Sequence, residues 1–318
     1  MPLTFLIPDL VRLAGDVPRL AMLELMLTRA DARPAPEGGM DGLLAEFFGL
    51  PSIPAVAPLT RLADTGQRDD AFWFRADPVH LAADRDQLVM LPPADLEIEA
   101  EEAHALAATF NQMYADDGFR LETPTPSRWY LGVPKDMDCE THDPEYMAGG
   151  PVFDFMPSGP DASQLKQLMN EVQMLFHEHP VNQARETAGK QLINTAWLWG
   201  GGRLPEVEIH GPRQVMTDLA LVRGLALFAG SGCTEWPGPL DAVLGAQTGL
   251  LALHADDARG LEKIEMHAAQ PLLHALRRGN LHSVDIYPGG TMIYRITRPM
   301  LRRFWRSRRA LKELPGQA

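Results

Sequence analysis

The chain has 318 residues, a formal net charge of −13, and a composition that is 45% hydrophobic and 22% charged, which is typical of a soluble globular protein. No apolar run reaches the roughly 20 residues that span a bilayer, and Pro8 and Asp9 interrupt the apolar N-terminal stretch, so we expect neither a transmembrane segment nor a signal peptide. The negative charge argues against general nucleic-acid affinity, and the two cysteines provide no disulfide framework, which favours a cytoplasmic protein.

The N-terminal part of the chain predicts a buried strand followed by short helices. Asp9 directly follows the first apolar run, which places it at the carboxyl edge of a sheet, where ligands of open α/β proteins bind. The predicted elements are a strand over 3–7, a helix over 19–30, a Pro/Gly/Ala loop over 31–39, a helix over 43–48 and an extended proline-rich stretch over 51–58.

Strands and helices continue to alternate downstream, which favours an α/β core. The segment 194–205 contains Trp197, Trp199 and three successive glycines, and it predicts a buried strand with both indoles on one face, running into a tight turn. The other elements are a strand from 72, helices over 97–117, 161–176 (capped by Asp161), 215–228 and 261–276, and a hairpin over 283–296.

Residues 298–312 form a basic tail without an acidic residue, and the rest of the chain then carries 22 basic and 42 acidic residues. Its apolar stripe predicts an amphipathic helix. Such a helix either closes the core with a solvated basic face or contacts an acidic partner, a membrane surface or nucleic acid. The stripe consists of Met300, Leu301, Phe304, Trp305 and Leu311.

Four blocks, taken in order, resemble the archaeal-type cofactor-independent phosphoglycerate mutases, and within that family the RpfE-type bacterial regulatory proteins. They are the His179–Arg185 block (HPVNQAR), the Asn194–Pro205 block (NTAWLWGGGRLP), the Asp218–Gly230 block and Trp236-Pro-Gly238. The resemblance implies an α/β fold with an alkaline-phosphatase-like core, 1–64 and 191–318, that carries an inserted α+β domain, 65–190. It also implies phosphoryl transfer by a serine nucleophile and two divalent metals.

The family's metal ligands are only partly matched. Asp9 matches the first metal aspartate, His254 resembles a metal histidine, and Asp256 or Asp257 could align with the aspartate that follows it. The second histidine of that block has no counterpart, and the late metal segment, here 285–290, has no histidine. Asp9, His254 and Asp256 are therefore expected to be a vestigial metal site, although Asp9 could equally be a helix cap and His254 a core residue.

The nucleophile is missing as well. The segment that corresponds to the family's nucleophile, 44–51, contains no serine, and Ser52 is out of register. Loss of a nucleophile together with metal ligands leaves no plausible mutase mechanism.

Arginines of the inserted domain predict an anion site, because guanidinium groups bind phosphate and carboxylate in a bidentate manner. The resemblance assigns this site to Arg75, Arg128, His179, Asn182 and Arg185. The alternative is that each arginine forms an internal ion pair, for example with Asp77 or Glu186.

These observations favour a regulatory or ligand-binding pseudoenzyme that has no cofactor and that binds a phosphorylated small molecule. The alternative is an enzyme, a phosphoglycerate mutase or phosphatase that uses Mn, Mg or Zn in a rearranged site of Asp9, His254 and Asp256. A third hypothesis is an interaction protein that binds an acidic partner through its basic C-terminal helix.

Overall fold

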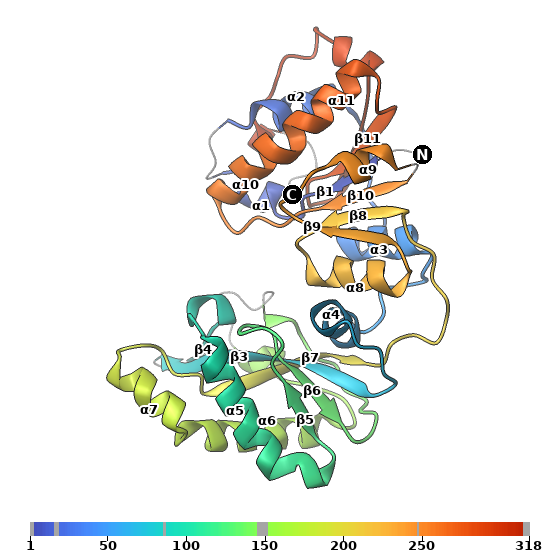
Figure 1. Ribbon diagram of the computed structural model, residues 1–318. Coiled ribbons are helices and arrows are strands. Elements are labelled where there is room, and N and C mark those ends of the chain that lie inside the picture. The colour runs from blue at the N-terminus through green and yellow to red at the C-terminus, as the bar shows by residue number, and fades with distance from the viewer. Residues whose placement is uncertain (1–2, 16–18, 85–86, 145–151, 247, 314–318) are drawn as a thin grey trace. The chain divides into compact units, whose positions relative to one another are not determined.

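The chain folds into two compact units (Figure 1). The computed structural model describes residues 3–15, 19–84, 87–144, 152–246 and 248–313. Unit 1 combines Met1–Ile53 with Val207–Ala318, and unit 2 is Pro54–Glu206. Within the described ranges, no helix is both long enough and apolar enough to cross a bilayer.

Unit 1 is built on a seven-stranded sheet with the order β2-β12-β11-β1-β10-β8-β9. β11, β1, β10, β8 and β9 run parallel to one another. At one edge, β12 pairs antiparallel with β11, and β2 pairs antiparallel with β12. The strands are β1 (Leu3–Leu6), β2 (Asp31–Pro34), β8 (Gln214–Thr217), β9 (Gly232–Glu235), β10 (Gly249–Ala252), β11 (Ser283–Tyr287) and β12 (Met292–Thr297). The central strands are buried on both faces, as expected for parallel strands covered by helices.

Helices cover both faces of this sheet (Figure 1). On one face α2, α10 and α11 enclose a core with Phe5, Leu251 and Ile286, and a π-helical turn, Glu265–Ala269, joins α10 to α11. α3 and α8 lie along the other face. The helices are α1 (Leu10–Leu13), α2 (Ala21–Arg29), α3 (Gly39–Phe48), α8 (Ala220–Phe228), α9 (Asp241–Gly245), α10 (Ala258–Ile264) and α11 (Gln270–Arg278).

Unit 2 has its own five-stranded antiparallel sheet, in which the long strand β3 pairs with β4, β6 and β7. Its strands are β3 (Phe72–Asp84), β4 (Gln87–Leu91), β5 (Arg120–Glu122), β6 (Tyr130–Val133) and β7 (Thr195–Gly202). The glycine run at the end of β7 has a steric cause, because a Cβ on Gly201 would lie 2.2 Å from the ring of Phe74. Trp197 and Trp199 on β7 are buried, as the sequence predicted.

The described residues of unit 2 also include four α-helices. α5 and α6 pack their apolar residues, among them Phe110 and Phe176, on the sheet in a core that is separate from that of unit 1. α4 contacts β3 and β7. The helices are α4 (Val56–Thr65), α5 (Ala100–Tyr114), α6 (Ala162–His177) and α7 (Pro180–Thr187).

The unit boundaries differ from the expected positions at 64/65 and 190/191, because α4 and β7 belong to unit 2. β7 pairs with β3 from Trp73 to Val79, and α4 packs on both strands. Hydrogen bonding across the sheet therefore decides the boundary, and sequence composition does not reveal it.

Several local predictions are wrong. The expected loop 31–39 contains β2, which pairs with β12 as an edge strand, and α4 begins within the stretch expected to be extended. The first residues of the expected helix 215–228 form β8. Asp161 is the N-cap residue of α6, as predicted, but its side chain makes no capping bond; its carboxylate instead accepts a hydrogen bond from the backbone N–H of Asp138 (2.8 Å).

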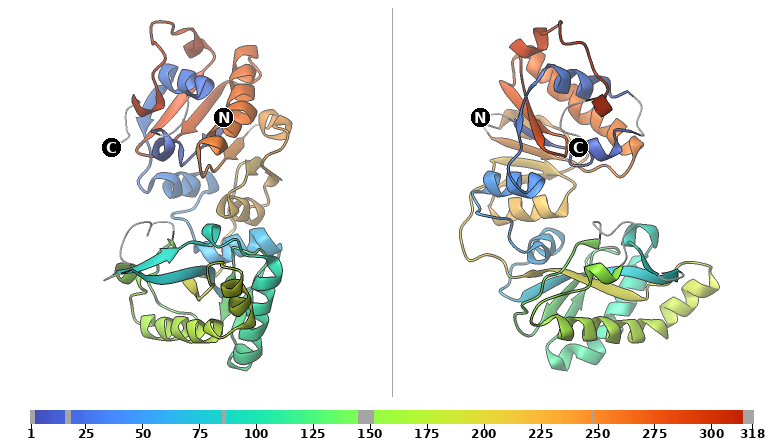
Figure 2. Two further views of the ribbon diagram at one scale, coloured as in Figure 1. Left: turned by 90° about the vertical axis from the view of Figure 1, so that its left-hand side faces the viewer. Right: turned by 180° about the vertical axis from the view of Figure 1, so that it is seen from behind.

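The basic tail is not an amphipathic helix. Two 3₁₀ turns, Pro299–Arg302 and Leu311–Glu313, flank an irregular stretch. Arg303 and Arg306 bind Asp31 and carbonyl groups at the end of α2, and these long-range bonds replace helical ones. The C-terminal segment thus runs along α2 (Figure 2).

Candidate functional site

Polar residues gather where three adjacent parallel strands of unit 1 end. Asp9 follows β1, His254 follows β10 and Asp218 follows β8. The chain after β1 is held close to the end of β11, since the backbone N–H of Val11 donates to the carbonyl of Pro288 (2.9 Å). Gly289 makes this approach possible: its φ is +89°, and a Cβ there would lie 2.2 Å from the carbonyl oxygen of Pro8.

The structure brings the three predicted metal residues together. The imidazole of His254 lies between two carboxylates, with Nδ1 2.6 Å from Asp9 Oδ2 and Nε2 2.8 Å from Asp256 Oδ1. Arg12, one turn along α1, donates to the other oxygen of Asp9 at 2.9 Å. Asp218 fixes the backbone by accepting the N–H of His254 at 2.9 Å.

The protonation of this cluster follows from its contacts. The hydrogen bond to Asp9, followed by the charge of Asp9 and the bond to Asp256, raises the pKa of His254 to about 9 against the cost of burial. Burial opposes ionisation of Asp9, but His254 and Arg12 outweigh it and hold the pKa of this carboxyl below its usual value. At neutral pH the cluster is therefore a network of ion pairs.

The cluster does not fit a pair of divalent cations. Metal ions need carboxylate and imidazole atoms that can turn their lone pairs toward them. Here both ring nitrogens of His254 and both oxygens of Asp9 have protein partners, and Asp256 is 92% exposed. Across the part of the chain that the structure describes, no three His, Cys, Asp or Glu side chains are grouped so as to hold a metal ion.

The predicted anion residues of unit 2 fall into two groups. Arg75 on β3 lies over the ring of the buried Tyr130, and Arg128, before β6, binds the same carboxylate, Asp64, as the Tyr130 hydroxyl. Arg75 pairs with Asp77 (2.6 Å), and Arg128 binds Asp64 in a bidentate manner (2.7 and 2.9 Å). The hydroxyl of Tyr130 donates to Asp64 at 2.6 Å.

This cluster keeps both arginines charged. Burial opposes the charge of Arg75, but Asp77 outweighs it and raises the pKa. The hydrogen bond to Asp64 raises the pKa of Arg128. The other oxygen of Asp77 accepts the indole N–H of Trp199 at 2.7 Å. Both arginines thus form internal ion pairs of the kind that the sequence offered as an alternative, Arg75 with Asp77 and Arg128 with Asp64, while the side chain of Arg128 remains 35% exposed.

His179, Asn182 and Arg185 lie at α7 and bond to the surrounding backbone. Arg185, 1% exposed, pairs with Glu102, not with Glu186, and donates to the carbonyl groups of Leu96 and Gln191. The amide of Asn182 bridges carbonyl groups at 2.7 and 2.8 Å. His179 caps α7 and bonds Thr109. These three side chains hold α7 in place, and among the described residues none of them forms a hydrogen bond or ion pair with Arg75 or Arg128.

Comparison with known proteins finds a family match in unit 2. Residues 64–182 match the family of 2,3-bisphosphoglycerate-independent phosphoglycerate mutases, and the match lies entirely within unit 2. The mutase of Methanothrix thermoacetophila is 30% identical over 146 residues, 44% of this chain and 37% of that protein. A probable mutase of Geobacter sulfurreducens is 29% identical over 164 residues, 49% of this chain and 41% of that protein.

Part of this chain is thus similar to the 2,3-bisphosphoglycerate-independent phosphoglycerate mutases. The match covers only about two fifths of the length of these curated relatives. The PH0037 protein of Pyrococcus horikoshii shares the fold with a TM-score of 0.55 at 14% identity, over 93% of this chain and 86% of that protein. The expected α/β fold, a core that carries an α+β unit between its two sequence segments, is confirmed.

The segment expected at the position of the nucleophile, 44–51, forms the end of α3 and the residues after it. Gly49 ends the helix in the left-handed conformation, and Ser52 lies beyond it in an exposed loop. No hydroxyl group of this segment bonds Asp9 or His254 among the described residues.

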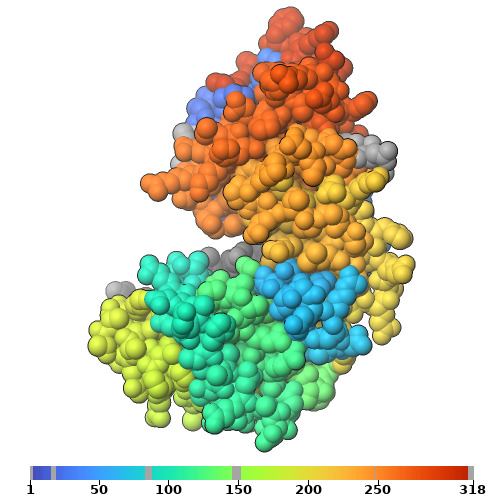
Figure 3. Space-filling view, viewed as in Figure 1, coloured from blue at the N-terminus to red at the C-terminus, as the bar shows by residue number. Residues whose placement is uncertain are grey.

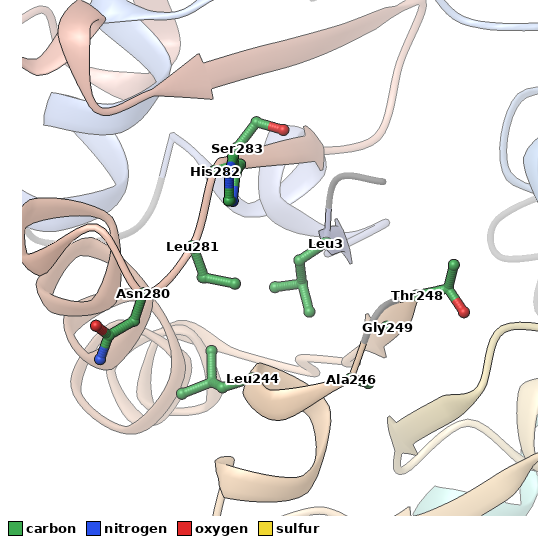
Figure 4. A pocket seen from close by; sticks show the side chains of 9 residues that line it. All are labelled: Leu3, Leu244, Ala246, Thr248, Gly249, Asn280, Leu281, His282 and Ser283. Atoms are coloured by element: carbon green, nitrogen blue, oxygen red, sulfur yellow. The ribbon is translucent and has the colours of Figure 1, made fainter.

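A separate pocket of unit 1 lies at the opposite end of the strands (Figure 4). It has a volume of about 400 Å³ and is lined by the starts of β1, β10 and β11, including Leu3, Gly249 and Ser283. Because Asp9 and His254 follow the other ends of the same strands, this pocket is not part of their cluster.

Asp218 is a member of the cluster that sequence reasoning missed. It falls within the segment predicted to be a helix, 215–228, whereas it follows the buried strand residues Val215 and Met216. The sequence does contain an indication of this position, because Asp218 follows a short apolar run, Val215 and Met216, just as Asp9 follows the apolar run 3–7.

Proposed function

We propose that the protein is a phosphoglycerate-mutase-like pseudoenzyme, a cytoplasmic regulatory or ligand-binding protein of the RpfE type that binds a phosphorylated small acid and needs no metal cofactor. The observation that carries this proposal is that the side chains of Asp9, His254 and Asp256 already bond protein partners. His254 is held by Asp9 and Asp256, and Arg12 occupies the remaining side of Asp9. Internal ion pairs thus take up the side chains that a pair of metal ions would require.

The missing nucleophile supports the same proposal. Phosphoryl transfer through an enzyme intermediate needs an activated hydroxyl group, and the segment 44–51 has none. Removal of one member of a cooperating catalytic set costs about 10⁴ to 10⁶ in rate, and here several members are replaced.

The proposed ligand site is the arginine cluster of unit 2, the part of the chain that matches the family. Arg75 lies over the ring of Tyr130, Arg128 binds the same Asp64 as the Tyr130 hydroxyl, and each arginine is balanced by one carboxylate. Arg128 is partly exposed, so its guanidinium can also contact an anion, while His179, Asn182 and Arg185 support the unit by holding α7.

The inactivity is tested by mutase assays with 3-phosphoglycerate and Mn²⁺. We expect no turnover above that of the Asp9→Ala variant. Mn²⁺-dependent turnover that disappears in Asp9→Ala would refute the pseudoenzyme and establish the alternative, a metal-dependent mutase or phosphatase that uses Asp9, His254 and Asp256. The convergence of these three residues is what favours that alternative.

Ligand binding is tested separately by calorimetry with 3-phosphoglycerate. We expect Arg128→Ala to weaken binding at least about tenfold, the loss expected for a hydrogen bond to a charged group, and Arg128→Lys to restore it only in part because lysine lacks the planar fork. The matched control is Arg203→Ala, which removes another exposed arginine of unit 2. Equal affinity in Arg128→Ala and Arg203→Ala would exclude this site, whatever the result of the mutase assay.

A further inference from the structure

The C-terminal segment of unit 1, Arg298–Glu313, is fastened along α2 and its flanks. Arg306 donates to the carbonyl of Ala30 at 2.6 Å, and the backbone N–H of Arg309 donates to Thr28 Oγ1 at 3.1 Å. Arg303 binds Asp31 in a bidentate manner. Leu311, 4% exposed, inserts into the core of unit 1. The segment is thus fixed at both of its ends, and it forms part of the surface of unit 1 (Figure 3).

Two aromatic side chains stand out from this fastened segment. Phe304 is 81% exposed and Trp305 is 69% exposed. They lie between Arg303 and Arg306, the two residues that bind Asp31, so their backbone is held in place. The rings touch edge to face, with centroids 5.3 Å apart. Exposure of two adjacent large aromatic groups on a fixed backbone is costly in water and marks an interaction site.

Positive charge surrounds this aromatic pair. From 298 to 312 every charged residue is an arginine or lysine. Asp31 and Glu24 neutralise part of this charge by pairing with Arg303, Arg306 and Arg308. Arg302 and Arg309 lie on either side of the pair, both exposed, and their side chains have no ion pair within the described residues.

We propose that the acidic partner of this segment is the anionic surface of a phospholipid bilayer, with Phe304 and Trp305 inserted at the headgroup level and Arg302 and Arg309 against lipid phosphates. Aromatic rings beside cationic side chains are the composition that proteins use to bind at membrane interfaces. A basic residue near an anionic leaflet is attracted individually, so a small basic patch suffices even on an acidic protein.

The size and geometry of the patch favour lipid over other acidic partners. Two aromatic side chains bury at most about 150–250 Å² each, well below the roughly 800 Å² per partner of a stable protein interface. The rings are inclined at 82° to each other, which does not provide the stacked platform that single-stranded nucleic acid uses. Binding to lipid headgroups requires neither a large buried area nor stacked aromatic rings.

The experiment is co-sedimentation of the full chain with vesicles of phosphatidylcholine, with and without phosphatidylglycerol. We expect binding only to the vesicles with phosphatidylglycerol, weakened by salt as screening shortens the range of the attraction. The double variant Phe304→Ala/Trp305→Ala should bind at least about tenfold more weakly, given the apolar area it loses. Phe153→Ala is the matched control, because Phe153 is 68% exposed in unit 2, and it should bind like the unchanged protein.

Tryptophan fluorescence gives an independent readout. Trp73, Trp129, Trp197 and Trp199 are buried and Trp236 is partly buried, so protection from a water-soluble quencher on vesicle addition reports mainly on Trp305. Trp305→Phe should retain binding and lose this protection. Equal binding to neutral vesicles, unchanged binding by the double variant, or capture of single-stranded RNA in place of vesicles would each overturn the proposal.

Discussion

At the scale of single residues, His254 shows how contacts set a charge. Its imidazole is bonded by Asp9 and Asp256, and the pKa is raised to about 9. Because the folded pKa lies above the unfolded value near 6.5, the stabilisation is fully present below the unfolded pKa and is lost as the pH rises through about 9. We therefore expect the stability difference between the unchanged protein and His254→Asn to shrink from pH 6.5 to pH 9.

Two measurements check this expectation. NMR titration of the imidazole should give a pKa well above 6.5, and Asp9→Asn should lower it, because Asp9 is the largest cause of the shift. Denaturant unfolding at several pH values gives the stability difference. A pKa that Asp9→Asn leaves unchanged would mean that the ion pair is absent in solution.

Gly289 is a second residue with a distinct prediction. Its φ is +89°, and a Cβ at this position would lie only 2.2 Å from the carbonyl oxygen of Pro8. There is no room for an L side chain, so Gly289→Ala should destabilise unit 1 by about 1–3 kcal/mol. Gly245→Ala serves as control, because a Cβ there meets no atom within 4 Å. Equal midpoints for the two variants in urea unfolding would contradict the close approach.

At the scale of elements, α2 depends on a cap from a distant part of the sequence. No side chain of its own caps its N-terminus, and Glu265 instead accepts the backbone N–H groups of Met22 and Leu23, the latter at 3.0 Å. Glu265→Ala should therefore cost about 0.5–2 kcal/mol, the usual effect of losing a cap. Glu262→Ala removes an exposed glutamate of α10 and should have little effect on the unfolding free energy.

The sequence predicted those elements whose cause is local. The apolar run Leu3–Ile7, the helix that became α5 and the hairpin of β11 and β12 are all present. The predictions fail for segments whose structure is determined by contacts with residues far away in the sequence. The tail has helical periodicity, but Asp31 and the end of α2 hold its arginines in another path, and β2 is a strand only because β12 lies beside it.

The candidate site could be predicted in part for the same reason. Motifs identify Asp9, His254 and Asp256, and the structure brings them into contact. Arg12 binds the Asp9 oxygen that His254 leaves free, and Asp218 accepts the backbone N–H of His254. Both contacts depend on how the strand ends meet in the folded sheet, and the spacing of residues in the sequence does not show this. The five anion residues do not form the single group that the motifs predict, because motif matching carries no information on which arginines already have partners.

At the scale of the whole molecule, the unit boundaries make a prediction about folding. Unit 2 has its own core, four buried tryptophans and a sheet closed by β7, so the fragment 54–206 should fold alone and unfold cooperatively. The shorter fragment 65–190 lacks α4 and β7 and should remain unfolded. Near-ultraviolet circular dichroism shows whether each fragment is folded. A folded 65–190 fragment would show that unit 2 does not need α4 and β7.

The pairing of β1 has a consequence for biosynthesis. β1 lies between β10 and β11, so during synthesis β1 has neither neighbour until all of unit 2 and the segment that contains β10 have been translated. Unit 2 is complete in sequence long before that point, and domains generally fold as units during synthesis. The nascent chain therefore passes through a stage in which a finished middle unit separates an early, apolar strand from its partners, and the exposed edges of that strand are what a chaperone would protect.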